Sequence, residues 1–206
     1  MVTICTYNAR TLASEFSIED LLVQARMIKN DVIGLAETRR RHTFNAVCDT
    51  GEELFLGTCD SRGVGGVGVL VNTSMSMNID SFEQLATRIG RLRLKRCGST
   101  PDLTIFVVYA QEVEAFYMDL ERFHREDHTF FKVIIGDFNA KIGPRRSSEE
   151  RHTRSSLEIS MPRSDQEDRL RNVTLNVTLG THGLEWNEQG ERLSEFIMAT
   201  KTIHGN

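Results

Sequence analysis

Short apolar runs alternate with polar stretches along the chain, and most of these runs have the length and composition of β-strands. Alternation and β-forming residues predict a first strand over residues 2–7, which ends at Asn8. Ser17 and Asp20 form a capping-box pattern, and apolar residues at helical spacing follow to about Asn30. The chain therefore begins with a β-strand followed by an α-helix.

The same pattern continues through most of the chain. Further apolar runs, separated by Gly-rich or polar breaks, predict strands at residues 31–36, 54–59, 66–71, 89–95, 103–109 and 130–135. Amphipathic patterns predict helices over residues 113–123 and 188–199, the latter burying Leu193, Phe196 and Ile197. Strands outnumber helices and the two are mixed, which predicts an α/β (α+β) sandwich with helices covering β-sheets.

The length of 206 residues allows one sizeable domain with a hydrophobic core, so we expect residues 1–206 to form a single domain. Residues 144–179 differ from their surroundings because they are polar and show little periodicity. This stretch is too long for an ordinary loop of a compact domain. We predict a disordered insertion at 144–179, with a weak strand over residues 173–179.

Several classes of protein do not fit this chain. No apolar run approaches the length of a membrane span, and the N-terminus lacks the charged and apolar regions of a secretion signal. The four cysteines are scattered without a C-x-x-C pair, which argues against a zinc site and against a disulfide framework. We expect an intracellular protein, nuclear or cytoplasmic and not secreted, with no membrane partner.

Charge is unevenly distributed in a chain whose net charge is −4. Residues 88–96 contain Arg88, Arg91 and Arg93 among five basic residues and no acid, and residues 39–41 are all arginine. A basic face on an acidic protein is compatible with contact to a phosphate backbone. Ordinary solvated surface explains the same pattern equally well.

The most informative polar residues follow the ends of predicted strands: Asn8, Glu37, Tyr109, and the pair Asp137 and Asn139. In a layered fold, such ends meet at one edge of the sheets and can form one pocket. Carboxylate, amide and hydroxyl oxygens suit Mg²⁺ or Mn²⁺ and suit neither zinc nor copper. Each residue alone also has an ordinary structural explanation as a turn former, a helix first-turn acid or a core aromatic.

The ordered set of motifs around these residues resembles the endonuclease/exonuclease/phosphatase superfamily, and most closely the apurinic-endonuclease-like domain of non-LTR retrotransposons. The motifs are Thr6-Tyr7-Asn8-Ala9-Arg10, Leu35-Ala36-Glu37-Thr38-Arg39, Gly65-Gly66-Val67-Gly68-Val69-Leu70-Val71, Arg88-Ile89-Gly90-Arg91-Leu92-Arg93, Val107-Val108-Tyr109-Ala110 and Gly136-Asp137-Phe138-Asn139-Ala140. The likeness covers residues 1 to about 143 and resumes at residues 180–196.

The resemblance implies a four-layered α/β sandwich, with two mixed sheets packed face to face and helices outside. It also implies roles. Glu37 would hold the Mg²⁺ or Mn²⁺, with Asn8 nearby. Asp137 would orient or deprotonate the attacking water. Tyr109 would bind the scissile phosphate, and Asn139 would steady it. From charge alone we expect Arg39, Arg40, Arg88, Arg91 and Arg93 to contact DNA. We further expect a monomer, derived from an ancestor that carried a reverse transcriptase domain.

The chain also departs from the pattern that the resemblance implies. Further strands bearing an Asp and a Ser-Asp-His motif are expected after this point, and the sequence ends at Asn206 without them. The Asp-His dipeptide at Asp127 and His128 precedes the strand of Asp137, and we expect it at the surface. We therefore expect an incomplete DNA endonuclease domain, inactive or weakened as it stands.

Two alternatives to a nicking endonuclease stay open at this point. One is a decayed or domesticated fragment that binds nucleic acid or protein without catalysis. The other is a hydrolase of phosphoinositide or phospholipid head groups, as in other branches of the superfamily.

Overall fold

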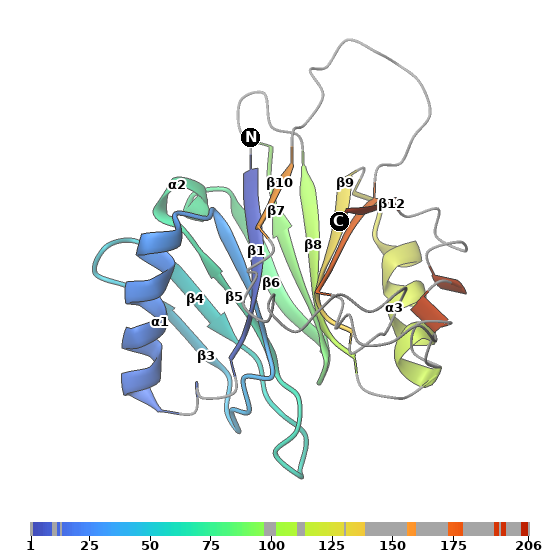
Figure 1. The fold of residues 1–206 in the computed structure, drawn as a ribbon, viewed down its shortest axis with the longest axis horizontal. Coiled ribbons are helices and arrows are strands. Elements are labelled where there is room, and N and C mark those ends of the chain that lie inside the picture. Colours follow the sequence, from blue (N-terminus) through green and yellow to red (C-terminus); the bar gives the residue numbers. More distant parts are fainter. Residues whose placement is uncertain are drawn as a thin grey trace, which may run out of the picture.

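Two six-stranded β-sheets pack face to face, and helices cover their outer faces (Figure 1). The computed structural model describes residues 2–9, 12, 14–96, 102–110, 114–129, 131–138, 192–193 and 195–196, together with the backbone of strands 156–159, 173–178 and 203–205. This arrangement confirms the predicted four-layered α/β sandwich.

The first sheet has the strand order β10-β1-β2-β5-β4-β3. Its strands are β1 (Val2–Asn8), β2 (Val32–Ala36), β3 (Phe44–Val47), β4 (Glu53–Leu56), β5 (Val67–Val71) and β10 (Ser156–Ile159). Only β1 and β2 are parallel, and the other neighbours are antiparallel. Helix α1 (Glu15–Ile28) covers its outer face.

The second sheet has the order β12-β11-β9-β8-β7-β6. Its strands are β6 (Ile79–Ala86), β7 (Ile89–Leu94), β8 (Leu103–Tyr109), β9 (Phe131–Asp137), β11 (Val173–Thr178) and β12 (Ile203–Gly205). Strands β8, β9, β11 and β12 run parallel, whereas β6, β7 and β8 are antiparallel neighbours. Helix α2 (Thr73–Ser76) precedes β6, and helix α3 (Glu114–Glu126) lies on the outer face of this sheet.

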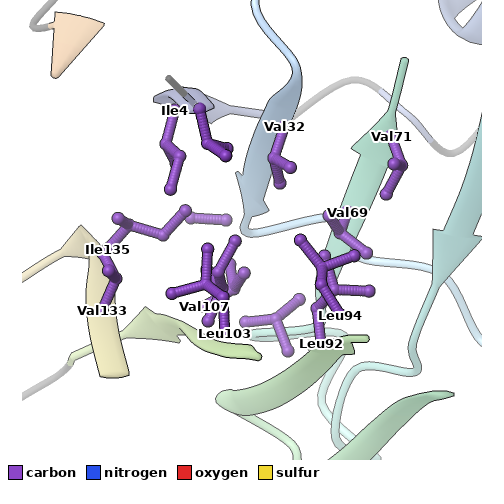
Figure 2. Close-up of a cluster of buried hydrophobic side chains, with 14 of the residues drawn as sticks. Ile4, Val32, Val69, Val71, Leu92, Leu94, Leu103, Val107, Val133 and Ile135 are labelled. Carbon is purple, nitrogen blue, oxygen red and sulfur yellow. The ribbon is translucent and has the colours of Figure 1, made fainter. Parts of the chain in front are cut away.

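Side-chain alternation along the central strands builds three apolar layers. Between the sheets, residues such as Ile4, Val69, Val107 and Ile135 form the largest cluster (Figure 2). The opposite faces of the same strands pack against the helices, so that Phe106 on β8 belongs to the cluster under α3. The uninterrupted apolar runs in the sequence are therefore central strands that are buried on both faces.

The sequence predicted the central strands well and the edges poorly. Strand β8 has the predicted bounds, and β1, β2, β5, β7 and β9 differ by one or two residues at their ends. Strands β3 and β6 at the sheet edges were missed, because an edge strand needs fewer apolar residues. The predicted cap of α1 was three residues late: Ser14 is the N-cap and accepts a bond from the Ser17 N–H.

The later part of the chain supplies strands to both sheets. Within 144–179, the described segments are β10, which pairs with β1, and β11, which pairs with β9 and falls where a weak strand was predicted. In the last predicted helix, Leu193 and Phe196 are buried as expected, in the cluster that includes residues of α3, and Ile197 lies outside the described residues.

Asp127, at the end of α3, is buried, and the prediction that it lies at the surface was wrong. Its side chain is 0% exposed and accepts bonds from Arg93 at 2.9 and 3.1 Å and from Arg91 at 3.5 Å. Thr104 Oγ1 and the Thr129 N–H donate to its other oxygen at 3.2 and 3.0 Å. The carboxylate thereby ties the end of α3 to β7 and β8, while the adjacent His128 is exposed as predicted.

Gly136 allows the end of β9 to approach β8 closely. Its φ is 153°, and a Cβ at this position would lie 1.9 Å from the Val108 carbonyl oxygen. Only glycine fits there, so the register that pairs Tyr109 with Asp137 depends on this residue.

Among the described residues, no helix is long and apolar enough to cross a membrane.

Replacing Asp127 by alanine is expected to lower the free energy of unfolding by about 3–5 kcal/mol, because Arg93 loses its buried partner and Arg91 keeps only Glu83. Urea unfolding at pH 7 measures the loss. The control is Asp119→Ala, which removes a 43% exposed carboxylate paired with Arg122 on α3 and should change stability by less than about 1 kcal/mol. Equal losses in the two variants would contradict this account.

The difference in the free energy of unfolding between wild type and Asp127→Ala should be smaller in acid. Burial raises the pKa of Asp127, but bonds from Thr129 and Arg93 outweigh it and hold the pKa below its ordinary value. A lowered pKa in the folded chain stabilises the fold above the unfolded pKa of about 3.9, and this contribution disappears as the pH falls through the folded pKa. The difference between wild type and Asp127→Ala should therefore shrink below about pH 4, and a constant difference from pH 3 to 7 would refute the role of its charge.

Gly136→Ala is expected to destabilise the fold by about 3 kcal/mol, because the new methyl group overlaps a backbone carbonyl that cannot move aside cheaply. Gly63→Ala is the control: it also has positive φ, at 78°, but open space around the new Cβ. The control should cost only about 1 kcal/mol of backbone strain. Urea unfolding of both variants separates steric overlap from strain.

Candidate active site

Four polar residues lie at the carboxyl ends of four central strands, two in each sheet. Asn8 ends β1 and pairs in register with Ala36, the residue before Glu37. Tyr109 ends β8 and pairs in register with Asp137, which ends β9. Because each of these strand pairs is parallel, both members of a pair finish at the same edge of their sheet.

Side-chain alternation points Asn8 and Asp137 toward the space between the sheets. Asn8 continues the series of Ile4 on β1, and Asp137 continues that of Ile135 on β9, and both apolar residues belong to the inter-sheet core. The Asn8 Nδ2 lies 3.5 Å from the Asp137 Oδ2 and donates a long hydrogen bond to it. This bond joins residues 129 positions apart and brings the two sheets together at one polar site.

Glu37 leaves β2 in an unusual backbone conformation. Its φ is 62° and that of Arg39 is 53°, values that side-chain-bearing residues rarely adopt. Bonds from the Thr38 N–H to Gly66 O (3.0 Å) and from the Arg39 N–H to Gly65 O (3.1 Å) hold the segment in place. The strained turn after β2 is therefore clamped from the start of β5.

The two glycines of that clamp pack closely against neighbouring turns. A Cβ on Gly66 would lie 2.5 Å from Thr38 Oγ1, so a larger residue would push the Glu37 turn away. The Gly66 N–H also donates to Thr87 O, at 2.8 Å, in the turn between β6 and β7. The clamp thus extends from the first sheet to the second.

The Glu37 carboxylate is buried and pairs with Arg39. Its side chain is 3% exposed, and its Oε1 accepts a bond of 2.5 Å from Arg39, whose side chain is 46% exposed. The sequence identified both residues but gave no sign that they pair. The two side chains meet across a turn that has positive φ at both residues.

Tyr109 is buried at the same edge. It is 3% exposed and belongs to the inter-sheet core, as a tyrosine with an apolar ring should. Its N–H donates to Arg88 O at 3.0 Å, and the next N–H, of Ala110, donates to Asp137 O at 2.8 Å. These bonds place the turn that carries Arg88 beside the ends of β8 and β9.

The predicted basic residues divide into two groups. Arg39, Arg40 and Arg88 lie in the turns at the site edge, where Arg40 also stacks on the Phe44 ring and donates to Leu12 O. Arg91 and Arg93 lie on β7, on the face that packs toward α3, and both bind Asp127. The structure brings only the first group together with the strand ends.

The oxygen donors at this edge suit a hard divalent cation. No group of three or more His, Cys, Asp or Glu side chains gathers within the described part of the chain. Magnesium typically uses one or two carboxylates and keeps waters or phosphate oxygens as its other ligands. Glu37, Asp137 and the Asn8 amide meet that requirement, whereas Asn139 lies outside the described residues.

Comparisons with known proteins give a match only at the level of structure. No family model matches the sequence, and no curated protein matches it either. The endonuclease domain of TRAS1, a telomere-specific non-LTR retrotransposon, matches with a TM-score of 0.55 and 12% identity over 97% of this chain and 72% of that one. The AP endonuclease LMAP from Leishmania major matches with a TM-score of 0.59 and 14% identity over 97% of this chain.

The chain spans 66% of the length of the Leishmania enzyme. At these identities the likeness concerns the arrangement of strands and helices. The chain has the endonuclease/exonuclease/phosphatase fold, the fold of retrotransposon and AP endonuclease domains.

Proposed function

We propose that this domain cleaves phosphodiester bonds of DNA and depends on a divalent metal ion. The observation that carries the proposal is the contact between Asn8 and Asp137, which joins the carboxyl ends of two sheets with Glu37 and Tyr109 at the same edge. A phosphodiesterase needs a cation ligand, a group that handles water and a group that binds phosphate. The strand ends supply one candidate for each.

Glu37 and Asn8 are the residues that would hold the Mg²⁺ or Mn²⁺. The amide nitrogen of Asn8 is committed to Asp137, so Asn8 presents its oxygen as a ligand. The clamp on the Glu37 turn fixes the position of the carboxylate before any ligand arrives. When bound, the cation neutralises charge that develops on the scissile phosphate.

Asp137 orients the attacking water and accepts its proton. The bond from Asn8 fixes the orientation of this carboxylate, which is the first requirement for a general base. Tyr109, held in register beside it, donates its hydroxyl proton to a phosphate oxygen, and Asn139 steadies the same phosphate. Arg39, Arg40 and Arg88 contact the DNA backbone on either side.

Alanine at Asp137 or at Glu37 should reduce Mg²⁺-dependent nicking of supercoiled plasmid by at least about 100-fold, because each group contributes roughly that factor to such reactions. The measurement is the initial rate of open-circle formation. Asp119→Ala, a surface carboxylate on α3, serves as the control and should retain the wild-type rate.

Wild-type nicking no faster than that of Asp137→Ala would remove the enzyme proposal. Salt-sensitive DNA binding without cleavage would then identify a non-catalytic nucleic-acid-binding domain. Phosphate release from inositol lipid head groups, with plasmid left intact, would identify a lipid hydrolase instead.

Arg88→Ala should weaken DNA binding by a similar factor for all sequences and reduce the slope of log affinity against log salt by about 1, as expected for one lost phosphate contact. Fluorescence anisotropy with a labelled duplex in EDTA measures binding without cleavage. Arg122→Ala removes a 58% exposed arginine on α3, which covers the outer face of the second sheet, and is the control. An unchanged slope for Arg88→Ala would exclude Arg88 from the DNA contact.

A further inference from the structure

We propose that Arg39 competes with the divalent cation for Glu37 and releases this carboxylate when its guanidinium binds a DNA phosphate. Metal and DNA would then bind cooperatively. This inference rests on the proposed function, because it takes Glu37 as the metal ligand, and it adds a device that controls when Glu37 is available.

The first support is the difference in burial across the ion pair. The Glu37 side chain is 3% exposed and that of Arg39 is 46% exposed. A carboxylate removed from water needs a positive partner, whereas an arginine at the surface can exchange one partner for another at little cost. Arg39 is therefore the member of the pair that can leave.

The second support is the rigidity of the Glu37 turn. Backbone bonds from Thr38 and Arg39 to the two clamp glycines fix this turn, and its positive φ values leave few alternative conformations. Glu37 cannot easily move away to find a cation elsewhere. The exchange of partners must come from the long side chain of Arg39, which extends from the same turn.

The third support is the chemistry of the two partners that Arg39 can bind. A guanidinium presents a planar fork of donors that matches a carboxylate or a phosphate equally well. A phosphate that approaches the exposed side of Arg39 would draw the guanidinium away and free the Glu37 Oε1 that it occupies. A divalent cation can then bind this oxygen, and by thermodynamic reciprocity the cation also strengthens DNA binding.

Arg39→Gln tests the competition directly. We expect this variant to bind Mn²⁺ roughly 5- to 10-fold more tightly than wild type without DNA, a typical size for coupling between two sites. Electron paramagnetic resonance of free Mn²⁺ measures the affinity, with a non-cleavable phosphorothioate duplex added in a second series. The duplex should tighten Mn²⁺ binding in wild type and have little effect in Arg39→Gln.

Arg62→Gln is the matched control. Arg62 pairs with Asp60 two residues earlier, as Arg39 does with Glu37, but its side chain is 77% exposed and it does not contact Glu37. It should keep the wild-type Mn²⁺ affinity and the response to DNA. Equal tightening in both variants would show an effect of net charge alone and would overturn the proposal.

Two further variants separate the possible failures. If Glu37→Gln binds Mn²⁺ as wild type does, the proposed metal site itself is wrong. If Glu37→Gln loses Mn²⁺ while Arg39→Gln matches wild type, the site stands and the role of Arg39 is refuted. Arg39→Lys keeps a positive charge without the planar fork, so it should give an intermediate affinity, and it answers the question if the glutamine variant fails to fold.

Discussion

Parallel pairing within each sheet, combined with face-to-face packing of the two sheets, is the constraint on which the rest of the structure depends. Strands β1 and β2 finish together, and so do β8 and β9. Their inner faces form one apolar cluster, so the two pairs of carboxyl ends meet across it. Polar residues placed just beyond the apolar part of each strand then gather at one place without needing any loop of their own.

That geometry requires local support at both ends of the second sheet. At the site end, Gly136 lets β9 lie against β8, and Gly66 connects the Glu37 turn to Thr87 on the other sheet. At the far end, Asp127 ties α3 to β7 and β8 through buried bonds. Of these contacts, the Gly66–Thr87 bond joins the two sheets directly, whereas Gly136 and Asp127 hold the strands of the second sheet and α3 in position.

The sequence predicted the core of the fold because central strands leave a strong signal. A strand that is buried on both faces is apolar throughout, and a polar residue directly after it, such as Asn8 or Asp137, stands out. Edge strands lack this contrast, which is why β3 and β6 were missed. The burial of Asp127 was missed for a related reason. A carboxylate beside a histidine after a charged helix is typical of an exposed position, and nothing in the local sequence indicates that Arg93 and Thr104 contact it from other strands.

Two ion pairs with the same spacing in the sequence differ in burial, and the local sequence does not predict this difference. Asp60 and Arg62 have the same spacing as Glu37 and Arg39, and each arginine bonds the acid two positions before it. The acid is 22% exposed in the first pair and 3% exposed in the second. In the Asp60–Arg62 pair water competes with the bond and makes it weak, whereas in the Glu37–Arg39 pair the carboxylate is shielded from water. The position of the acid relative to the sheets, and not the local sequence, decides which pair can control a site.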